Sequence, residues 1–308
     1  MHNLPSSDPY RTYDIVCIGN YTKDTIISPS GTRYVDGGAM NYAAHAGARL
    51  GYRVAVVTHL AKEDDRVVKN LEQAGVDCHV QYTPHSTLME LFYPTDNPDV
   101  RTLSVKATAG AITAREVLDI EMKAAVIGSS LRGEVGLDVI QALHARGVLL
   151  AADVQGYVRV LRGERLVYEP WEEMAATLAH LDILKSDAVE AEFLTGEKDI
   201  YKAAQFYARL GAKEIVLTHK EGVLIYADGK NYEASFYPKE MLGRSGRGDT
   251  CLGTYTAMRL SKEPAEAGIW AAAVTSLKME KLGPFSCSIG EVEELIRLKY
   301  RNGSAPKN

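Results

Sequence analysis

The segment from Gly243 to Thr250 carries three glycines, at 243, 246 and 248, followed at once by Asp249 and an apolar stretch with helical spacing. Closely spaced glycines let backbone N–H groups converge on an anion, and the positive end of a following helix favours the same spot. The segment therefore predicts a phosphate-binding turn. Asp249 would repel a resting anion, so two interpretations stay open. It accepts the proton of a hydroxyl that attacks a phosphate, or it only caps the helix.

The composition sets the broad class of protein. The chain has 308 residues, of which 46% are hydrophobic and 24% charged, which is ordinary for a globular protein with a large core. A formal net charge of −5 offers no basic surface, so we expect no nucleic-acid partner and no membrane partner. Four scattered cysteines indicate a reducing compartment, and no apolar run is long enough for a signal peptide or a membrane span. The expected location is the cytoplasm.

Apolar, β-branched runs alternate with longer amphipathic stretches, which is typical of repeated βα units on a mostly parallel sheet. We expect one doubly wound α/β domain over residues 1–308. The expected strands are 14–19, 53–58, 124–128, 148–153, 183–185 and 214–218, and the expected helices are 40–50, 64–74, 133–145, 201–210, 249–260, 263–281 and 289–300.

Two stretches, Thr25–Val35 and Thr87–Lys106, break this rhythm because they contain strand patterns and polar turns but no helix. We expect these two insertions to form a small antiparallel β lid over the main sheet. Ordinary edge hairpins are the alternative.

Several motifs are absent. No HExxH or other metal-ligand spacing appears among the eight histidines, which argues against a zinc enzyme. The chain has no GxxxxGK[ST], so it is not a P-loop kinase, and no GxGxxG follows the first strand, which counts against a dinucleotide oxidoreductase.

Four segments, taken in order, resemble the pfkB (ribokinase-like) family of carbohydrate kinases over almost the whole chain. They are Ile18–Asp24, Gly37–Gly51, Asp187–Gly196 and Gly246–Thr250. The resemblance implies an ATP-dependent kinase that uses Mg²⁺ and phosphorylates a small carbohydrate or polyol, and it allows a monovalent cation. The Gly-Arg-Gly-Asp variant is similar to a branch with inositol kinases, so myo-inositol is the first substrate to consider.

The resemblance assigns the phosphate-binding turn a catalytic role. Asp249 aligns with the family's catalytic base, and Gly246, Arg247 and Gly248 would supply the backbone N–H groups that hold the transferring phosphate. The family usually has alanine where this chain has Arg247. Its guanidinium would contact a phosphate or an acidic substrate, or point to solvent.

The resemblance also places substrate-binding residues. Asp24 matches the family's acceptor of substrate hydroxyls, with a plain loop aspartate as the alternative, and Gly37 and Gly38 would let the backbone approach the substrate. Counted from Gly37, Tyr42 occupies the family's substrate-binding asparagine position and Asn41 stands one residue earlier, so either side chain is a candidate. Further candidates follow another strand end, Gln155 and Arg159.

Donor and metal binding are expected in the C-terminal half. Asp187, where the family usually has asparagine, and Glu190 would organise water around Mg²⁺; solvated acids on a helix face are the alternative. Thr218 and Gly222 resemble the adenine-side loop. The small-residue stretch Ala271–Ser276, with Ala273 at its centre, resembles the helix that flanks the nucleotide base, although alanine-rich helices are also common for packing alone.

A sugar or polyol kinase with Asp249 as base is the favoured function. A nucleoside kinase of the same fold is one alternative, and a non-catalytic sensor of nucleotide or sugar is the other. We also expect a homodimer formed through the lid, because so small a sheet cannot bury both of its faces.

Overall fold

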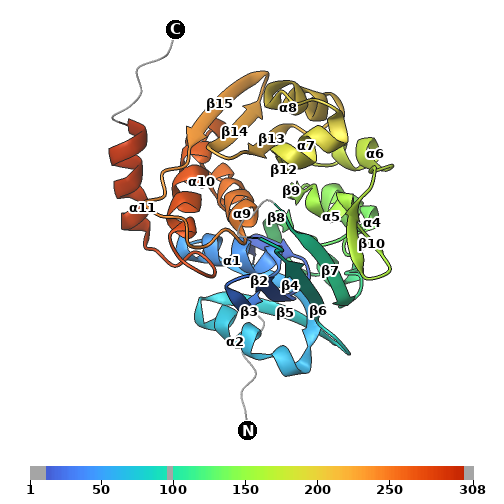
Figure 1. The fold of residues 1–308 in the computed structure, drawn as a ribbon. Helices are drawn as coiled ribbons and strands as arrows, with labels where there is room; N and C mark the ends of the chain where they lie inside the picture. The colour runs from blue at the N-terminus through green and yellow to red at the C-terminus, as the bar shows by residue number, and fades with distance from the viewer. Residues whose placement is uncertain (1–11, 96–99, 302–308) are drawn as a thin grey trace.

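The computed structural model describes residues 12–95 and 100–301. Its centre is a nine-stranded sheet with the order β15-β14-β13-β12-β9-β8-β1-β4-β5 (Figure 1). All neighbours from β13 to β5 are parallel, whereas β13, β14 and β15 form an antiparallel meander. The strands are β1 Tyr13–Ile18, β4 Val54–Ala61, β5 Val76–Thr83, β8 Met122–Ile127, β9 Leu149–Asp153, β12 Ile183–Asp187, β13 Glu214–Thr218, β14 Gly222–Ala227 and β15 Lys230–Ser235.

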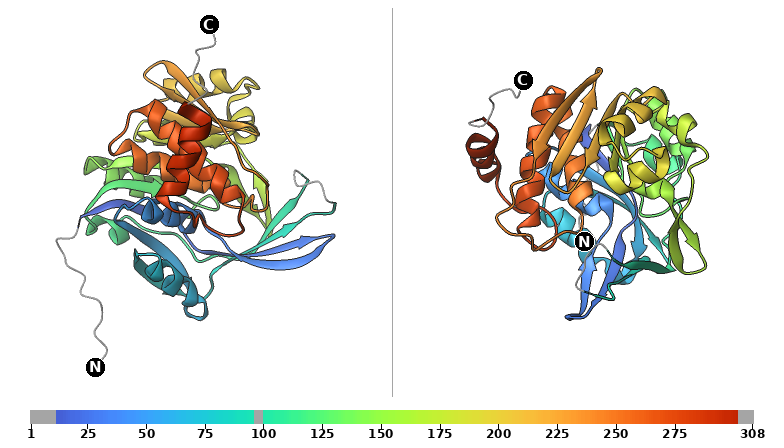
Figure 2. Two further views of the ribbon diagram at one scale, coloured as in Figure 1. Left: turned by 90° about the vertical axis from the view of Figure 1, so that its left-hand side faces the viewer. Right: turned by 45° about the horizontal axis from the view of Figure 1, so that its top comes forward.

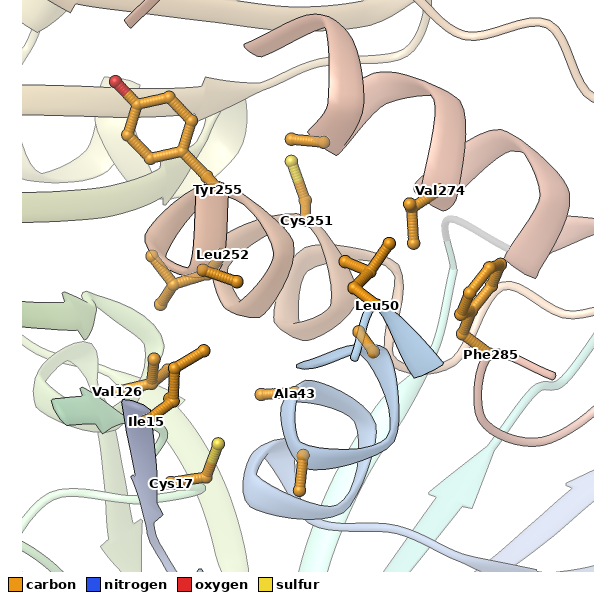
Figure 3. Packing of buried hydrophobic residues seen from close by; sticks show 14 of the residues in the cluster. Ile15, Cys17, Ala43, Leu50, Val126, Cys251, Leu252, Tyr255, Val274 and Phe285 are labelled. Atoms are coloured by element: carbon orange, nitrogen blue, oxygen red, sulfur yellow. The ribbon is translucent and has the colours of Figure 1, made fainter. Parts of the chain in front are cut away.

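Helices cover both faces of this sheet. The first strand shows why, because Ile15 and Cys17 pack into one hydrophobic core while Val16 and Ile18 pack into the other. Figure 3 shows the first core, where α1, α9 and α10 meet over Ile15 and Val126. The helices are α1 Ala39–Arg49, η1 Lys62–Asp64, α2 Arg66–Gln73, α3 Arg115–Leu118, α4 Leu137–Ala145, α5 Gln155–Val158, α6 Met174–Leu178, α7 Ala188–Thr195, α8 Ile200–Arg209, α9 Arg247–Arg259, α10 Pro264–Met279, α11 Ile289–Ile296 and η2 Arg297–Arg301.

A second sheet of six strands stands off the core, in the order β10-β11-β7-β6-β2-β3 (Figure 2, left). Its pairs are antiparallel except β2 with β6, which is parallel. The lid is defined here as this sheet. Ile26, Met89, Leu91 and Val105 form its own small core. The strands are β2 Thr22–Ser28, β3 Gly31–Asp36, β6 Thr87–Phe92, β7 Thr102–Ala107, β10 Arg159–Arg162 and β11 Arg165–Tyr168.

The expected fold class is confirmed, with differences in detail. The hairpin β10–β11 joins the lid although its two four-residue strands are too short and too charged to be recognised. The expected strands omit β5, whose half-buried polar residues conceal it, and the hairpin partners β14 and β15. Residues 96–99 of the second insertion lie outside the described residues. Within the described ranges, no helix combines the length and apolar character needed to cross a bilayer.

Candidate active site

Asp249 lies in the first turn of α9, close to the carboxyl ends of β9 and β12. Gly246 occupies the N-cap position, and no described side chain caps this helix. The capping interpretation of Asp249 is therefore wrong. Its Oδ1 instead accepts a hydrogen bond of 3.3 Å from Nε2 of Gln155, which comes from α5 after strand β9. The structure thus brings together two of the predicted site residues that are far apart in the sequence.

At two positions of the turn, neighbouring side chains leave no room for any residue larger than glycine. Gly246 has φ of 72°, and a Cβ built on it would lie 2.2 Å from the ring of Tyr42. A Cβ on Gly248 would lie 2.7 Å from Nζ of Lys185. The turn is consequently pressed between an aromatic ring and an ammonium group, and the first N–H groups of α9 are left without intrahelical partners. This arrangement suits an anion.

Buried ions lie directly under the turn. Lys185 Nζ is 2.9 Å from Asp153 Oδ2 and 3.9 Å from Glu190 Oε2, and Arg159 Nη2 is 3.6 Å from Glu190 Oε1. Burial works against the charge of Lys185, but Asp153 and Glu190 outweigh it and raise the pKa of this lysine above its usual range. Lys185 therefore stays charged throughout the physiological pH range.

The same surroundings tune Asp249. Burial raises the pKa of Asp249 above its ordinary value, while the positive charges of Lys185 and Arg159 oppose the rise. A carboxylate with a raised pKa is a better proton acceptor than one in water, and the two cations limit the rise. The site can therefore provide a base beside an anion-binding turn.

Asp24 faces the same region from lid strand β2. Its Oδ1 is buried and has no hydrogen-bond partner among the described residues, and its Oδ2 lies 2.5 Å from the position of a Cβ on Gly37. Burial raises the pKa of Asp24 to about 6; a hydrogen bond from Thr22 opposes the rise, and the negative charge of Asp249 adds to it. An orphaned carboxylate oxygen of this kind can accept a hydrogen bond from a hydroxyl of a ligand.

Asn41 and Tyr42, the two candidates in α1, point in different directions. Asn41 donates from Nδ2 to the backbone oxygen of Asp36 at 3.3 Å, so it braces the loop before α1. The hydroxyl of Tyr42 is buried without a hydrogen-bond partner among the described residues, and its ring lies against Gly246. Tyr42 is thus the one of the two that has an unsatisfied polar atom beside the turn.

A cavity of about 430 Å³ opens next to Tyr42, between the lid and the turn. Arg33 and Tyr34 line it from β3, and Arg244 and Lys278 line it from the opposite side. The cavity is large enough for a cyclic polyol or a larger acceptor, and its walls combine aromatic rings with cationic groups.

On the opposite side of the turn, Thr218 ends β13 with a buried hydroxyl that has no hydrogen-bond partner among the described residues. Burial lowers the pKa of His219 in the β13–β14 turn; the charges of Glu233 and Glu221 oppose the fall, and the charge of Arg247 adds to it more weakly. The direction of the Arg247 guanidinium stays a prediction. Packing explains why small residues stand at two other candidate positions. A Cβ on Gly222 would lie 2.4 Å from Ala234 O, and Ala273 is fully buried in the core. Their contact with a donor stays a prediction.

The C-terminal segment covers part of the small-residue helix α10. The backbone N–H of Tyr237 donates to Ser276 Oγ at 2.9 Å, and the rings of Tyr237 and Tyr300 meet edge to face at 5.3 Å. Tyr300 in turn donates to Ser235 O at 2.6 Å. Aromatic side chains thus lie over the helix segment that was expected to flank a nucleotide base.

Asp187 and Glu190 form a capping box at the start of α7, in which each side chain accepts the backbone N–H of the other residue. Across the described ranges, no three His, Cys, Asp or Glu side chains are grouped so that they could hold a metal ion. Mg²⁺ does not need such a group, because it is commonly held by one or two carboxylates, water and substrate phosphates. The two carboxylates fit that donor set.

Three residues of the site escaped the sequence analysis as candidates: Asp153, Lys185 and Lys278. Lys185 carried a signal, since it stands in an apolar strand two residues before Asp187. Lys278 is likewise the only charge among Ala271–Met279 of α10. A charged residue at a position that should be buried needs a partner. Lys185 pairs with Asp153 and Glu190 beneath the turn, and Lys278 donates to two carbonyls of the turn itself.

Comparisons with known proteins agree with this geometry. The pfkB family carbohydrate kinase domain matches residues 11–289. A cytidine kinase of Thermococcus kodakarensis is 26% identical over 266 residues, which cover 82% of this chain and 91% of that protein.

Solved structures give the same result. A pyrophosphate-dependent kinase of the ribokinase family, in a sulfate complex, is 34% identical with a TM-score of 0.85, covering 92% of this chain and 100% of that one. A pyrophosphate-dependent myo-inositol-1 kinase, altered into a myo-inositol-3 kinase, is 33% identical with a TM-score of 0.84 over 93% and 99% of the two chains. Arabidopsis thaliana ribokinase with ribose and ATP shares the fold at 18% identity, with a TM-score of 0.75 over 93% and 99%. The chain belongs to the pfkB family of carbohydrate kinases, and it is an enzyme of the kinase class.

Proposed function

We propose that this kinase transfers a phosphoryl group from pyrophosphate to a hydroxyl of a small polyol, with myo-inositol as the first acceptor to test. The observation that carries the proposal is the position of Asp249. It lies in the first turn of α9, directly after the glycine turn, and its charge acts on both Asp24 and Tyr42. A base is needed only if a hydroxyl reacts there, which argues against a non-catalytic sensor.

The chain's own groups support an in-line transfer. The acceptor hydroxyl gives its proton to an Oδ of Asp249 while its oxygen bonds to the transferring phosphorus. The bond from that phosphorus to the bridging oxygen breaks, and the remaining phosphate leaves with its electron pair. The N–H groups at the start of α9 take the charge that develops on the phosphoryl oxygens. When bound, Mg²⁺ would neutralise the donor phosphates, and Asp187 and Glu190 are the residues that would hold it through water.

Three observations favour pyrophosphate as the donor instead of ATP, which the resemblance implies. Pyrophosphate has no base to bind, so it must be held by charge, and Arg247 adds a guanidinium to the turn. Tyr237 and Tyr300 lie over the Ser276 end of α10, which is the segment that would flank the base of a nucleotide donor. The relatives that are 33–34% identical are pyrophosphate-dependent kinases. ATP is the second candidate because ribokinases of the same fold bind it.

The acceptor side supports a polyhydroxylated ring. Asp24 and Tyr42 each offer a buried polar atom without a partner among the described residues, and vicinal hydroxyls would satisfy both. A nucleoside acceptor is the second candidate, because a cytidine kinase is among the relatives and the aromatic wall of Tyr34 and Tyr42 could hold a base. A cytoplasmic location and a homodimer through the lid stay predictions.

A donor-by-acceptor panel tests the proposal. Pyrophosphate and ATP are each combined with myo-inositol, ribose and cytidine in the presence of Mg²⁺, and phosphorylated product is detected by ³¹P NMR. We expect pyrophosphate with myo-inositol to give the highest kcat/KM. Transfer only from ATP to cytidine would identify a nucleoside kinase, and no product from any pair would refute the proposed function.

A further inference from the structure

Lys278 is a buried charge that the proposed mechanism does not use. Lys278 lies in the apolar stretch Ala271–Met279 of α10, and only 1% of its surface is exposed although it carries a charge. Its Nζ donates to the backbone oxygens of Gly243, at 2.8 Å, and Ser245. The ring centroid of Tyr42 lies 5.3 Å from the same nitrogen. Backbone carbonyls and an aromatic face therefore stabilise this ammonium group, in place of a paired carboxylate.

Burying the Lys278 ammonium lowers the stability of the fold. Burial lowers the pKa of Lys278 to about 8, and the negative charge of Asp249 only partly offsets this. A buried ammonium without a paired carboxylate opposes folding, and methionine would fill the same space without that cost. Packing therefore does not explain why a lysine stands at this position.

The contacts of Lys278 act on the glycine turn itself. The N–H groups of Leu242 and Gly243 both donate to Met279 O at 2.9 Å, so the end of α10 already holds the start of the loop. The ammonium then fixes the carbonyls of Gly243 and Ser245. Because the peptide unit is planar and trans, a fixed Ser245 carbonyl makes the N–H of Gly246 point the opposite way. Gly246 is the N-cap of α9, three residues before Asp249.

We propose that Lys278 is a positioning residue whose ammonium acts as a built-in cation at the phosphate-binding turn. It holds the carbonyls of Gly243 and Ser245, sets the direction of the Gly246 N–H, and takes the place of a monovalent cation there. Backbone carbonyls are the ligands that K⁺ prefers, and the ammonium already occupies these two. The inference rests on the proposed kinase function, and it predicts that turnover does not depend on added K⁺.

Two substitutions of Lys278 test the inference. Lys278→Met keeps the apolar length and removes the charge, while Lys278→Ala leaves room for a small cation. Lys281→Met is the matched control, since this exposed lysine lies three residues further along the chain and its side chain contacts Cys287. We expect Lys278→Ala to lower kcat at least tenfold with little change in acceptor KM. Ammonium or K⁺ should restore part of the loss, and tetramethylammonium should not.

Two further readouts separate a positioning role from a structural one. The Tm of Lys278→Met should equal or exceed that of the unaltered protein, because the variant loses a buried charge. A Tm lower by more than about 5 °C would show that the ammonium serves the fold, and would overturn the inference. A K⁺-dependent wild type, or a Lys278→Ala variant with full turnover, would overturn it as well.

Calorimetry keeps this test independent of the proposed reaction. Titration with inorganic pyrophosphate, and with ATP in parallel, should show at least tenfold weaker binding to Lys278→Met than to Lys281→Met. If the protein binds a phosphate donor but phosphorylates no acceptor, the proposed function fails while the inference is still tested. Equal binding by the two variants refutes the inference alone.

Discussion

Nζ of Lys185 lies 2.9 Å from Oδ2 of Asp153, and the two residues are register partners on the neighbouring strands β12 and β9. Neither side chain is more than 5% exposed. The same ammonium faces Glu190 at 3.9 Å and lies against Gly248 of the turn. One buried cation thus joins the sheet, the capping box of α7 and the start of α9.

We expect Lys185→Met to lower the free energy of unfolding by about 3–5 kcal/mol, because it leaves two buried carboxylates without this cation. Lys213→Met is the control. It breaks a pair of similar length, 2.7 Å to Asp182, but Lys213 is exposed, so the loss should be about 0–1 kcal/mol. Urea denaturation measures both values. Equal losses would show that the buried pair is not a principal support of the site.

The pH dependence of acceptor binding tests Asp24. Its pKa is raised to about 6, so the carboxylate that accepts substrate hydroxyls is present above that pH and is lost as the pH falls through it. We expect acceptor Kd, measured by calorimetry, to rise below pH 6 and to lose most of that rise in Asp24→Asn. At pH 8, Asp24→Ala should cost about 1.5–3 kcal/mol in acceptor binding and leave the donor KM unchanged. An effect on the donor KM alone would place Asp24 in the wrong site.

Tyr42→Phe should separate stability from acceptor binding. The hydroxyl of Tyr42 is buried without a partner among the described residues, so its removal should leave Tm unchanged or raise it. Acceptor KM should rise about 2- to 13-fold, the equivalent of a hydrogen bond of about 0.5–1.5 kcal/mol. Asn41→Ala, which removes a contact to Asp36 O, should affect Tm instead. The opposite pattern would make Asn41 the substrate-binding residue.

Much of the fold is predictable from the sequence, since alternating strands and helices follow from local periodicity. Ile15 and Cys17 against Val16 and Ile18 show the two-sided burial expected of a central parallel strand. Lid strands β10 and β11 could not be found this way. They are short, and arginines stand at both ends of β10 and at the start of β11, so only the pairing of β11 with β7 reveals that the hairpin belongs to the lid.

The site was predicted where one segment supplies its own chemistry, as the glycine turn and Asp249 do. It could not be predicted where contacts join distant segments. Lys278 reaches a loop 33 residues away along the chain, and Lys185 is tied to Asp153 only by strand register. The orientation of Asn41 and Tyr42 was likewise undecided, because both lie within the same buried helical turn.

The central claim is that Asp249 removes the proton from the acceptor hydroxyl. The direct measurement is the single-turnover rate of Asp249→Asn with the donor and acceptor preferred by the wild type, together with donor affinity by calorimetry. We predict a rate lower by about 10²–10⁴, the usual effect of removing a general base, with donor Kd nearly unchanged. A variant that keeps more than about a tenth of the wild-type rate would contradict the assignment.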